Sequence, residues 1–318
     1  STSTPTSPPT DVAGSTVARN VPAAEFDVTV DLVRGLLEDQ HPDLVGLPLD
    51  VVANGWDNAI LRLGDDMAVR LPRRRLGADL VVHEQAWLPA LADRLPIPIP
   101  APVRTGGPGR GFPWSWSIVP WFRGEVAAES ELDDPTREAE RLGWFVRILH
   151  DTPAESAPSN QFRGFPVATL DERFDLNTAE LAGSDAIDPS IDVEEIRQRW
   201  ADLRSVRVEW AGPPMLIHGD LHTANMVVTD GEVSAVIDFG DITGGDPATD
   251  LAVAWMLFGE ADRAVFRRAV GAIDDDTWRR GQAWALHFAV LYLLHSADAP
   301  RFARMGGHLT RAILRSGV

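Results

Sequence analysis

The sequence contains no cysteine and no lysine among its 318 residues. Without cysteine there are no disulfides and no thiol catalysis, which excludes a secreted disulfide scaffold. Without lysine, any site that needs a cation must take it from arginine or from a metal ion. Long hydrophobic runs are missing too, because the most apolar late stretch, residues 285–294, is too short to span a bilayer.

Positive charge is scarce. The chain has 29 Lys+Arg against 47 Asp+Glu, a formal net charge of −18. Nucleic acids and anionic membranes are bound through basic surfaces, so we expect neither as a partner, whereas a cationic molecule would be attracted. Residues 1–9 are rich in Ser, Thr and Pro and lack the features of a signal peptide. We therefore expect a disordered tail over residues 1–24 and a cytoplasmic protein, as a monomer or homodimer.

Two short motifs carry most of the functional information. Residues 218–225 read His-Gly-Asp-Leu-His-Thr-Ala-Asn, and residues 237–241 read Ile-Asp-Phe-Gly-Asp. Phosphoryl transfer needs a carboxylate that accepts or orients the acceptor hydroxyl, together with oxygen ligands that hold Mg²⁺ against the phosphates. Asp220 fits the first role, and Asn225 and Asp238 fit the second.

The stretch between the motifs predicts a hairpin. Residues 226–229 and 233–237 are rich in β-branched side chains and are joined by Asp230-Gly231, a tight-turn pair. Such a hairpin would return the chain to the same cleft. In the first motif, we expect His218 to orient the catalytic loop, and His222 to contact either Asp220 or the fold itself.

On these residues the chain resembles the aminoglycoside phosphotransferase family, which includes macrolide kinases and other small-molecule kinases. The resemblance is most specific over residues 218–250. It implies an α+β, bilobal protein-kinase-like fold with a small antiparallel-sheet N-lobe that carries one main helix and a larger, mostly helical C-lobe. It also implies Mg²⁺, ATP or GTP as phosphoryl donor, and a hydroxylated small molecule as acceptor. The expected boundaries are 25–119 for the N-lobe, 120–124 for the hinge and 125–318 for the C-lobe.

The N-lobe is expected to contain strands at 49–53, 59–63 and 67–71 and a helix at 78–91. The turn after the first strand lies over the triphosphate in a kinase-like lobe, where its backbone N–H groups approach the phosphates. This turn consists of Asn54, Gly55, Trp56, Asp57 and Asn58.

The third strand ends in Ala68-Val69-Arg70, where a kinase has Ala-x-Lys. Strand alternation puts Ala68 and Arg70 on one face, so that Ala68 could touch the base while Arg70 reaches the phosphates. Glu84, in the following helix, is expected to pair with Arg70. Residues 73–75 are all arginine and are either competitors for this role or a solvated basic turn.

Residues 115–124 predict a buried strand that runs into the hinge. The resemblance places the nucleotide base here, beside Val119. It implies hydrogen bonds to the Pro120 carbonyl and the Phe122 N–H; proline lacks an N–H but keeps its carbonyl acceptor.

The C-lobe is expected to be mainly helical. The short distance in sequence between its second motif and the following helix excludes a peptide-binding platform. Only a few residues separate Gly240 from Pro247, whereas a protein kinase has a long activation segment there. The insertion between His150 and Pro214 is long enough to wall a pocket around a compact acceptor. Helices are predicted at 135–150, 170–181, 193–206, 247–258, 278–294 and 301–314.

Acidic and aromatic side chains of the C-lobe are candidates for acceptor binding. By resemblance, Asp250 supports the catalytic loop through backbone hydrogen bonds. The candidates to contact acceptor amines or wall the pocket are Asp241, Trp255, Glu260, Trp284, Asp246, Asp262 and Phe288. The motifs and these candidates together predict a nucleotide-dependent O-phosphotransferase that acts on an aminoglycoside-type antibiotic. The alternatives are a macrolide or sugar-metabolite kinase and, in another class, a nucleotide-binding module without turnover.

Overall fold

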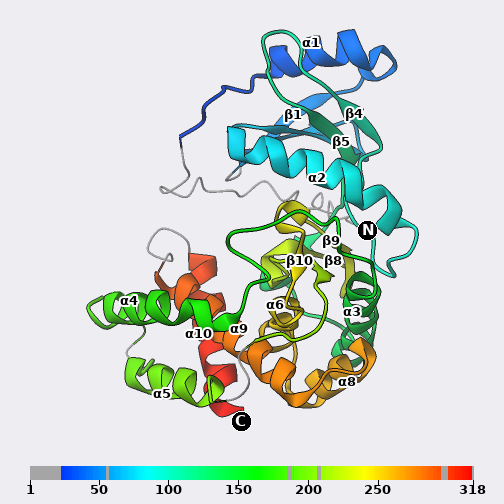
Figure 1. The fold of residues 1–318 in the computed structure, drawn as a ribbon. Coiled ribbons are helices and arrows are strands. Elements are labelled where there is room, and N and C mark those ends of the chain that lie inside the picture. The colour runs from blue at the N-terminus through cyan, green and yellow to red at the C-terminus, as the bar shows by residue number, and fades with distance from the viewer. Residues whose placement is uncertain are drawn as a thin grey trace, which may run out of the picture.

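The small lobe is built on a five-stranded antiparallel sheet (Figure 1). The computed structural model describes residues 23–54, 57–184, 188, 190–205, 209–294 and 300–316. The strand order is β1-β2-β3-β5-β4. The strands are β1 (Leu49–Asn54), β2 (Asn58–Leu63), β3 (Met67–Pro72), β4 (Arg104–Gly106) and β5 (Trp116–Pro120). Three of them confirm the strands expected from the sequence.

Two helices accompany this sheet. Helix α1 (Val30–Gln40) starts at Thr29, whose Oγ1 accepts a hydrogen bond from the Leu32 N–H at 3.2 Å. Its apolar face shares one core with the sheet, including Leu36 of the helix and Trp116 of β5. Helix α2 (Arg75–Ala92) contains the helix expected at 78–91 and buries Glu84 along with its apolar residues.

The chain crosses to the large lobe after β5. Residues 121–124 lead into β6 (Glu125–Val126), which pairs with β8 (Met226–Thr229) of the large lobe. Gly124 has φ +136°, and a Cβ at this position would lie 2.2 Å from the Val228 carbonyl oxygen. Only glycine fits this close crossing of two backbone segments.

The large lobe is mostly helical, with two small sheets beside the lobe boundary. Its helices are α3 (Pro135–His150), α4 (Asp171–Ala182), α5 (Val193–Leu203), α6 (Ala248–Leu251), α7 (Val253–Leu257), α8 (Glu260–Val270), α9 (Asp275–Leu294) and α10 (Pro300–Arg315). The sheets are β6-β8-β9, with β9 at Glu232–Val236, and β7-β10, with β7 at Met215–Ile217 and β10 at Thr243–Gly245. Short 3₁₀ turns lie at Pro42–Leu44, Ala127–Glu129, Val167–Leu170, Thr223–Asn225 and Phe239–Asp241.

Helix α9 is the centre of the large lobe. It packs against α4, α5, α6 and α10, and residues around its whole circumference are buried. A helix enclosed in this way needs no polar face, which explains its apolar sequence. Within the described residues, no helix combines the length and apolar character needed to cross a bilayer.

The expected bilobal α+β architecture is confirmed, with a small antiparallel-sheet lobe and a larger helical one. One predicted helix was wrong. The segment 247–258 forms two short helices, α6 and α7, because at the junction the Ala252 N–H donates to the Thr249 carbonyl, which is a tighter turn than an α-helix makes. Residues 1–22, where the tail was expected, lie outside the described residues.

Candidate active site

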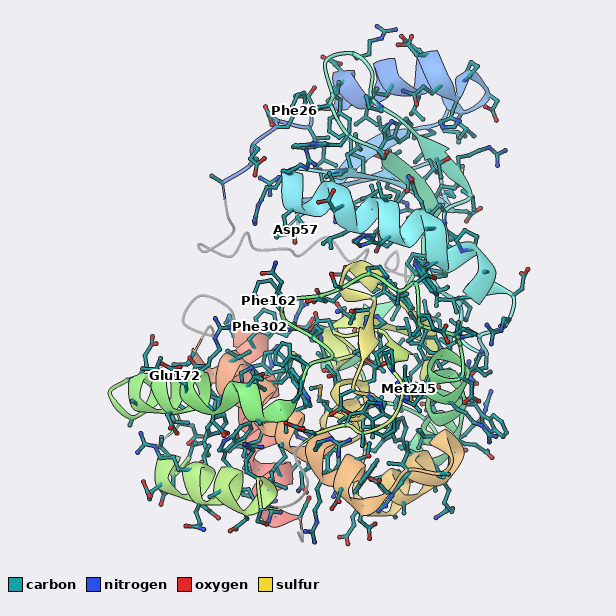
Figure 2. All side chains as sticks on the ribbon, in the orientation of Figure 1. Phe26, Asp57, Phe162, Glu172, Met215 and Phe302 are labelled. Carbon is teal, nitrogen blue, oxygen red and sulfur yellow. The ribbon has the colours of Figure 1, made fainter. Side chains whose placement is uncertain are left out.

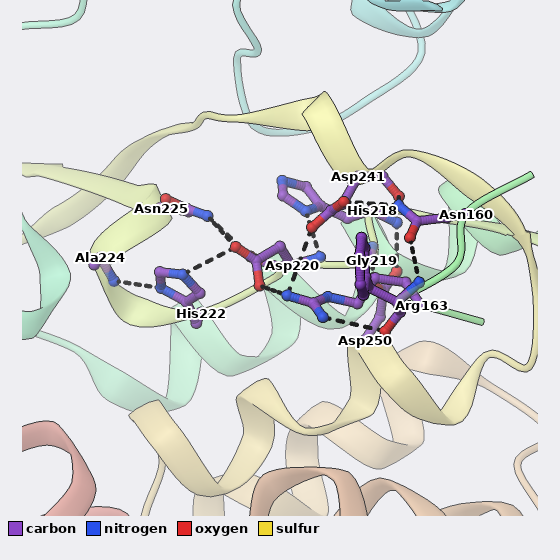
Figure 3. A network of polar contacts seen from close by, with 11 residues as sticks. Asn160, Arg163, His218, Gly219, Asp220, His222, Ala224, Asn225, Asp241 and Asp250 are labelled. Atoms are coloured by element: carbon purple, nitrogen blue, oxygen red, sulfur yellow. Dashed lines mark hydrogen bonds and ion pairs between the residues drawn. The ribbon is translucent and has the colours of Figure 1, made fainter. Parts of the chain in front are cut away.

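The catalytic-loop motif lies between β7 and β8 and is held by Asp250 of α6 (Figure 3). The Asp250 carboxylate is fully buried and accepts the backbone N–H groups of His218 and Gly219, each at 2.9 Å. Gly219 has φ +85°, and a Cβ there would lie 2.5 Å from the Asp241 carbonyl oxygen. The loop conformation therefore depends on a buried carboxylate and on a glycine.

His218 has both ring nitrogens engaged. Its Nδ1 accepts the Asp220 N–H at 3.3 Å, which leaves Nε2 to donate to the Ile237 carbonyl at 3.1 Å. The ring is fully buried and lies 4.4 Å, centroid to centroid, from the Phe239 ring. With no nitrogen open to the cleft, His218 can orient the loop but cannot take a proton from an acceptor.

Asp220 is surrounded by hydrogen-bond donors. Its Oδ1 accepts from Arg163 Nη2 at 2.9 Å, and its Oδ2 lies 3.3 Å from both His222 Nε2 and Asn225 Nδ2. His222 Nδ1 accepts the Ala224 N–H at 3.1 Å, so the proton of the neutral ring is on Nε2 and points at Asp220. Burial alone would raise the pKa of Asp220, but the hydrogen bonds from His222 and Arg163, together with the positive charge of Arg163, outweigh it and hold that pKa well below its usual range.

Asp238 lies where the two lobes meet. The Ile237 N–H donates to the Asn225 carbonyl at 2.9 Å, which brings the two motifs side by side. Asp238 adopts the left-handed conformation, with φ +64°, and its Oδ1 lies 3.2 Å from Arg70 Nη2 of the small lobe. Because this conformation is uncommon outside glycine, it marks a residue held in place by its surroundings.

Arg70 also makes the ion pair expected with Glu84, at 2.6 Å from Nη1 to Oε1. Both side chains are buried in the small lobe. Burial raises the pKa of Glu84, an effect that Arg70 partly offsets. Arginine thus stands where a lysine would be in other kinases, fixed between two carboxylates.

A cavity of about 280 Å³ lies under the small-lobe sheet. Its walls are mostly apolar and include most of the residues expected to bind nucleotide. From that set, it is lined by Asp57, Asn58, Ala68, Arg70, Val119, Pro120 and Phe122, joined by Asn225 and Asp238. Gly55 and Trp56 lie outside the described residues, as does the side chain of Asn54.

The residues expected to hold Mg²⁺ fit that ion. The Asn225 amide nitrogen donates to Asp220, at 3.0 Å to its carbonyl and 3.3 Å to its carboxylate, which directs the amide oxygen elsewhere. Asp238 keeps 55% of its side chain exposed, and both residues line the same cavity. Two protein oxygens that leave room for phosphate and water are a typical Mg²⁺ ligand set.

A second cavity, of about 650 Å³, adjoins the first and shares Asp57, Leu80 and Asp238 with it. Asp220 and Asp241 line it, as do Asp57 and Phe162, which lie on opposite lobes on the two sides of the lobe boundary (Figure 2). Arg163 also lines this cavity and was not among the predicted site residues. It is an isolated arginine in a Pro- and Ser-rich loop, at no fixed spacing from either motif, so no sequence signal separated it from the other arginines.

Several residues expected to contact the acceptor line neither of these two cavities. Trp255 and Trp284 are core residues with at most 2% exposure. Asp246 is buried against Arg280, at 2.8 Å from Oδ2 to Nε. Glu260 lies exposed in the first turn of α8, away from the cleft.

Two further candidates have other roles. Asp262 accepts a hydrogen bond from Thr136 Oγ1 at 2.6 Å on the surface. Phe288 is buried beneath Arg163, with the guanidinium carbon 5.3 Å from its ring centroid. Of the acidic candidates for acceptor amines, only Asp241 reaches the second cavity.

Two curated proteins are similar to this chain in sequence. The chain is 25% identical over 195 residues to an aminoglycoside 3'-phosphotransferase of Escherichia coli, which covers 60% of this chain and 68% of that protein. It is 24% identical over 157 residues to an aminoglycoside 3'-phosphotransferase of Salmonella typhimurium, covering 48% and 56% of the two chains.

Solved structures share the fold. The GDP complex of aminoglycoside 2'-phosphotransferase-IIIa superposes with a TM-score of 0.64 at 22% identity, over 88% of this chain and 97% of that one. A macrolide 2'-phosphotransferase of Brachybacterium faecium gives 0.57 at 23% identity, over the same shares of the chains. The model of the phosphotransferase enzyme family matches residues 49–284. The chain therefore belongs to the phosphotransferase enzyme family and is a phosphotransferase with an alcohol group as acceptor.

Proposed function

We propose that this enzyme transfers the γ-phosphoryl group of ATP or GTP to a hydroxyl of a small, amine-bearing molecule of the aminoglycoside type. One observation carries the proposal: an apolar cavity under the small lobe and a larger cavity with more polar and charged groups meet at Asp238, and Asp220 lies in the wall of the second. A nucleoside fits the first cavity and a hydrophilic acceptor the second. The triphosphate would lie at their junction.

Asp220 would act on the acceptor hydroxyl. It accepts the hydroxyl proton as the acceptor oxygen bonds to the γ-phosphorus, the bond from that phosphorus to the β–γ bridging oxygen breaks, and the nucleoside diphosphate leaves. Arg70 would bind the phosphates from the small lobe. Asn225 and Asp238 would hold Mg²⁺, which when bound neutralises phosphate charge.

The charge of the second cavity supports a cationic acceptor. Its ionisable lining consists of five aspartates, one arginine and one histidine: Asp57, Asp79, Asp220, Asp238, Asp241, Arg163 and His83. Burial raises the pKa of Asp57, and the nearby charges of Asp238 and Asp241 raise it further, against an opposing effect of Arg74. An ammonium group among these carboxylates would relieve their repulsion. Solved complexes of fold neighbours contain kanamycin, streptomycin and gentamicin.

A macrolide-type acceptor is the second candidate. Leu76 and Phe162 line the cavity from opposite lobes, and both are about half exposed. Such a pair would suit an acceptor with an apolar face.

The proposed donors also bear on localisation. ATP and GTP are both available inside cells, so we propose that the enzyme acts in the cytoplasm.

A nucleoside diphosphate release assay tests the proposal. Wild type would be incubated with ATP or GTP and Mg²⁺ and a panel of aminoglycosides, macrolides and sugars. We expect turnover with at least one amine-bearing acceptor, and Asp220→Asn should lower it by roughly 10²- to 10⁴-fold while nucleotide affinity stays nearly unchanged. Absence of both transfer and slow hydrolysis with either nucleotide would leave only a nucleotide-binding module without turnover.

A further inference from the structure

Arg163 is a fixed cation beside the proposed base Asp220. Its Nη2 lies 2.9 Å from Asp220 Oδ1 and 3.5 Å from Asp241 Oδ2. Its Nη1 donates to the Phe162 carbonyl at 3.1 Å, and its guanidinium lies over the Phe288 ring. Two carboxylates, one backbone carbonyl and one aromatic ring therefore contact the guanidinium.

The loop that carries Arg163 is fastened to the large lobe on both sides of it. Before Arg163, Thr243 Oγ1 donates to the Pro158 carbonyl and Asn160 Nδ2 donates to Asp241 Oδ1, each at 2.7 Å. After it, the Asp246 N–H donates to the Gly164 carbonyl at 2.9 Å. Arg163 is therefore anchored by the same lobe that holds Asp220, and its position does not depend on the small lobe.

Counting acceptor positions on Asp220 shows what Arg163 does there. A carboxylate has about four lone-pair positions, two on each oxygen. His222 and Asn225 both approach Oδ2, and Arg163 approaches Oδ1. Among the residues that the structure describes, these contacts leave one acceptor position for a hydroxyl, on Oδ1 next to the guanidinium.

We propose that Arg163 is a positioning residue that fixes the Asp220 carboxylate so that its one open acceptor position on Oδ1 faces the acceptor hydroxyl, and that Asp241 supports Arg163 rather than binding the acceptor. This inference rests on the proposed function, because it assigns Asp220 the role of base. Asp241 accepts a hydrogen bond from Asn160 on one carboxylate oxygen and pairs with Arg163 through the other, so both of its oxygens already have partners within the large lobe.

Replacement and chemical rescue test the proposal. Arg163→Ala should lower kcat by roughly 10- to 100-fold, as expected when a reacting group loses its orientation, while the KM for nucleotide stays within about twofold. Millimolar guanidinium chloride should restore part of the kcat of Arg163→Ala with saturation, and equal sodium chloride should not. Arg163→Lys should retain more activity than Arg163→Ala, because it keeps the charge but not the planar fork.

Arg204→Ala is a matched control. Arg204 makes two hydrogen bonds to the Asp171 carboxylate, at 2.6 and 2.7 Å. This pair joins α4 to the end of α5, and neither residue lines the two cavities. It should lose stability without loss of kcat, and guanidinium should not change its kcat. An Arg163→Ala variant whose kcat stays near wild type, or whose loss is not rescued and follows its thermal stability, would overturn the proposal.

A double variant tests the role of Asp241. Asp241→Asn should lower kcat less than Arg163→Ala does, and adding it to Arg163→Ala should cause little further loss, since both changes disturb one contact chain. Fully additive losses would overturn that part. A wild-type enzyme inactive on the whole panel would remove the proposed function and this inference with it, whereas an active wild type with an unimpaired Arg163→Ala would remove only this inference.

Discussion

Replacing Arg70 separates its contribution to stability from its contribution to nucleotide binding. Arg70 lies 2.6 Å from Glu84, and both side chains are at most 10% exposed. In Arg70→Met, the Glu84 carboxylate loses its partner in a buried site. Leaving one charge of a buried pair uncompensated costs about 3–5 kcal/mol. At ~2 °C per kcal/mol for a chain of this size, the melting temperature should fall by roughly 6–10 °C.

A second replacement should restore stability but not function. In Arg70→Met/Glu84→Leu, both buried charges are replaced by apolar groups, which is often nearly neutral for stability. The melting temperature should return to near that of wild type. Nucleotide affinity should stay low, because charge-assisted hydrogen bonds to phosphate are worth about 1.5–3 kcal/mol, or roughly 10- to 100-fold in Kd.

Glu84→Leu is the second single variant and completes the double-mutant cycle. Thermal-shift measurements give the melting temperature of each variant, and titration with a fluorescent nucleotide analogue gives its nucleotide affinity. If Arg70→Met is as stable as wild type, then Arg70 does not stabilise the buried charge of Glu84. A double variant with wild-type nucleotide affinity would refute the phosphate-binding role of Arg70 and transfer that role to metal or to residues 73–75.

Three further predictions follow from the geometry. Gly219→Ala should lower turnover and should lower the free energy of unfolding by about 1–2 kcal/mol. The reason is that the new Cβ would lie 2.5 Å from the Asp241 carbonyl oxygen, at a residue with positive φ. Unchanged kinetics in a coupled assay would contradict this prediction. Burial, with the charges of Arg163 and Arg173, lowers the pKa of His287 to about 3. Below pH 6.5 the unfolded state then binds the extra proton, so stability falls as the pH falls from 6.5 toward 3, by about 2 kcal/mol at pH 5; His287→Gln should lose this part of the acid sensitivity in urea unfolding at pH 7 and 5. Glu260→Gln should leave kcat/KM within roughly twofold for every acceptor, because a surface side chain outside both cavities contacts no substrate, and a larger change would reinstate it as an acceptor ligand.

Local sequence patterns predicted much of the fold. Strands β1, β2 and β3 and helix α3 were predicted within a residue or two of their observed bounds, because alternation, Gly-Asp turns and the Asp134-Pro135 helix start are local signals. Helices α1 and α8 were not predicted. The segment 247–258 was predicted as one helix, since nothing in its composition marks the tight turn at Ala252.

The site divides in the same way. Residues in short motifs, such as Asp220, Asn225 and Asp238, were found because phosphoryl transfer requires those groups at nearly fixed separations. Acceptor-side residues were poorly predicted. Trp255 and Trp284 have the composition of a pocket wall but are enclosed by helices, and Arg163 has no motif at all.

The sequence by itself predicted the chemistry: two motifs indicated the base and the metal-binding oxygens, and the absence of lysine left arginine or a metal ion as the cation near β3. Only the tertiary structure decided which distant groups meet those residues. It brought Arg163 to Asp220, 57 positions away. The physical reason is that motif spacing follows from bonded geometry along the chain, whereas contacts between loops depend on how the large lobe packs around α9.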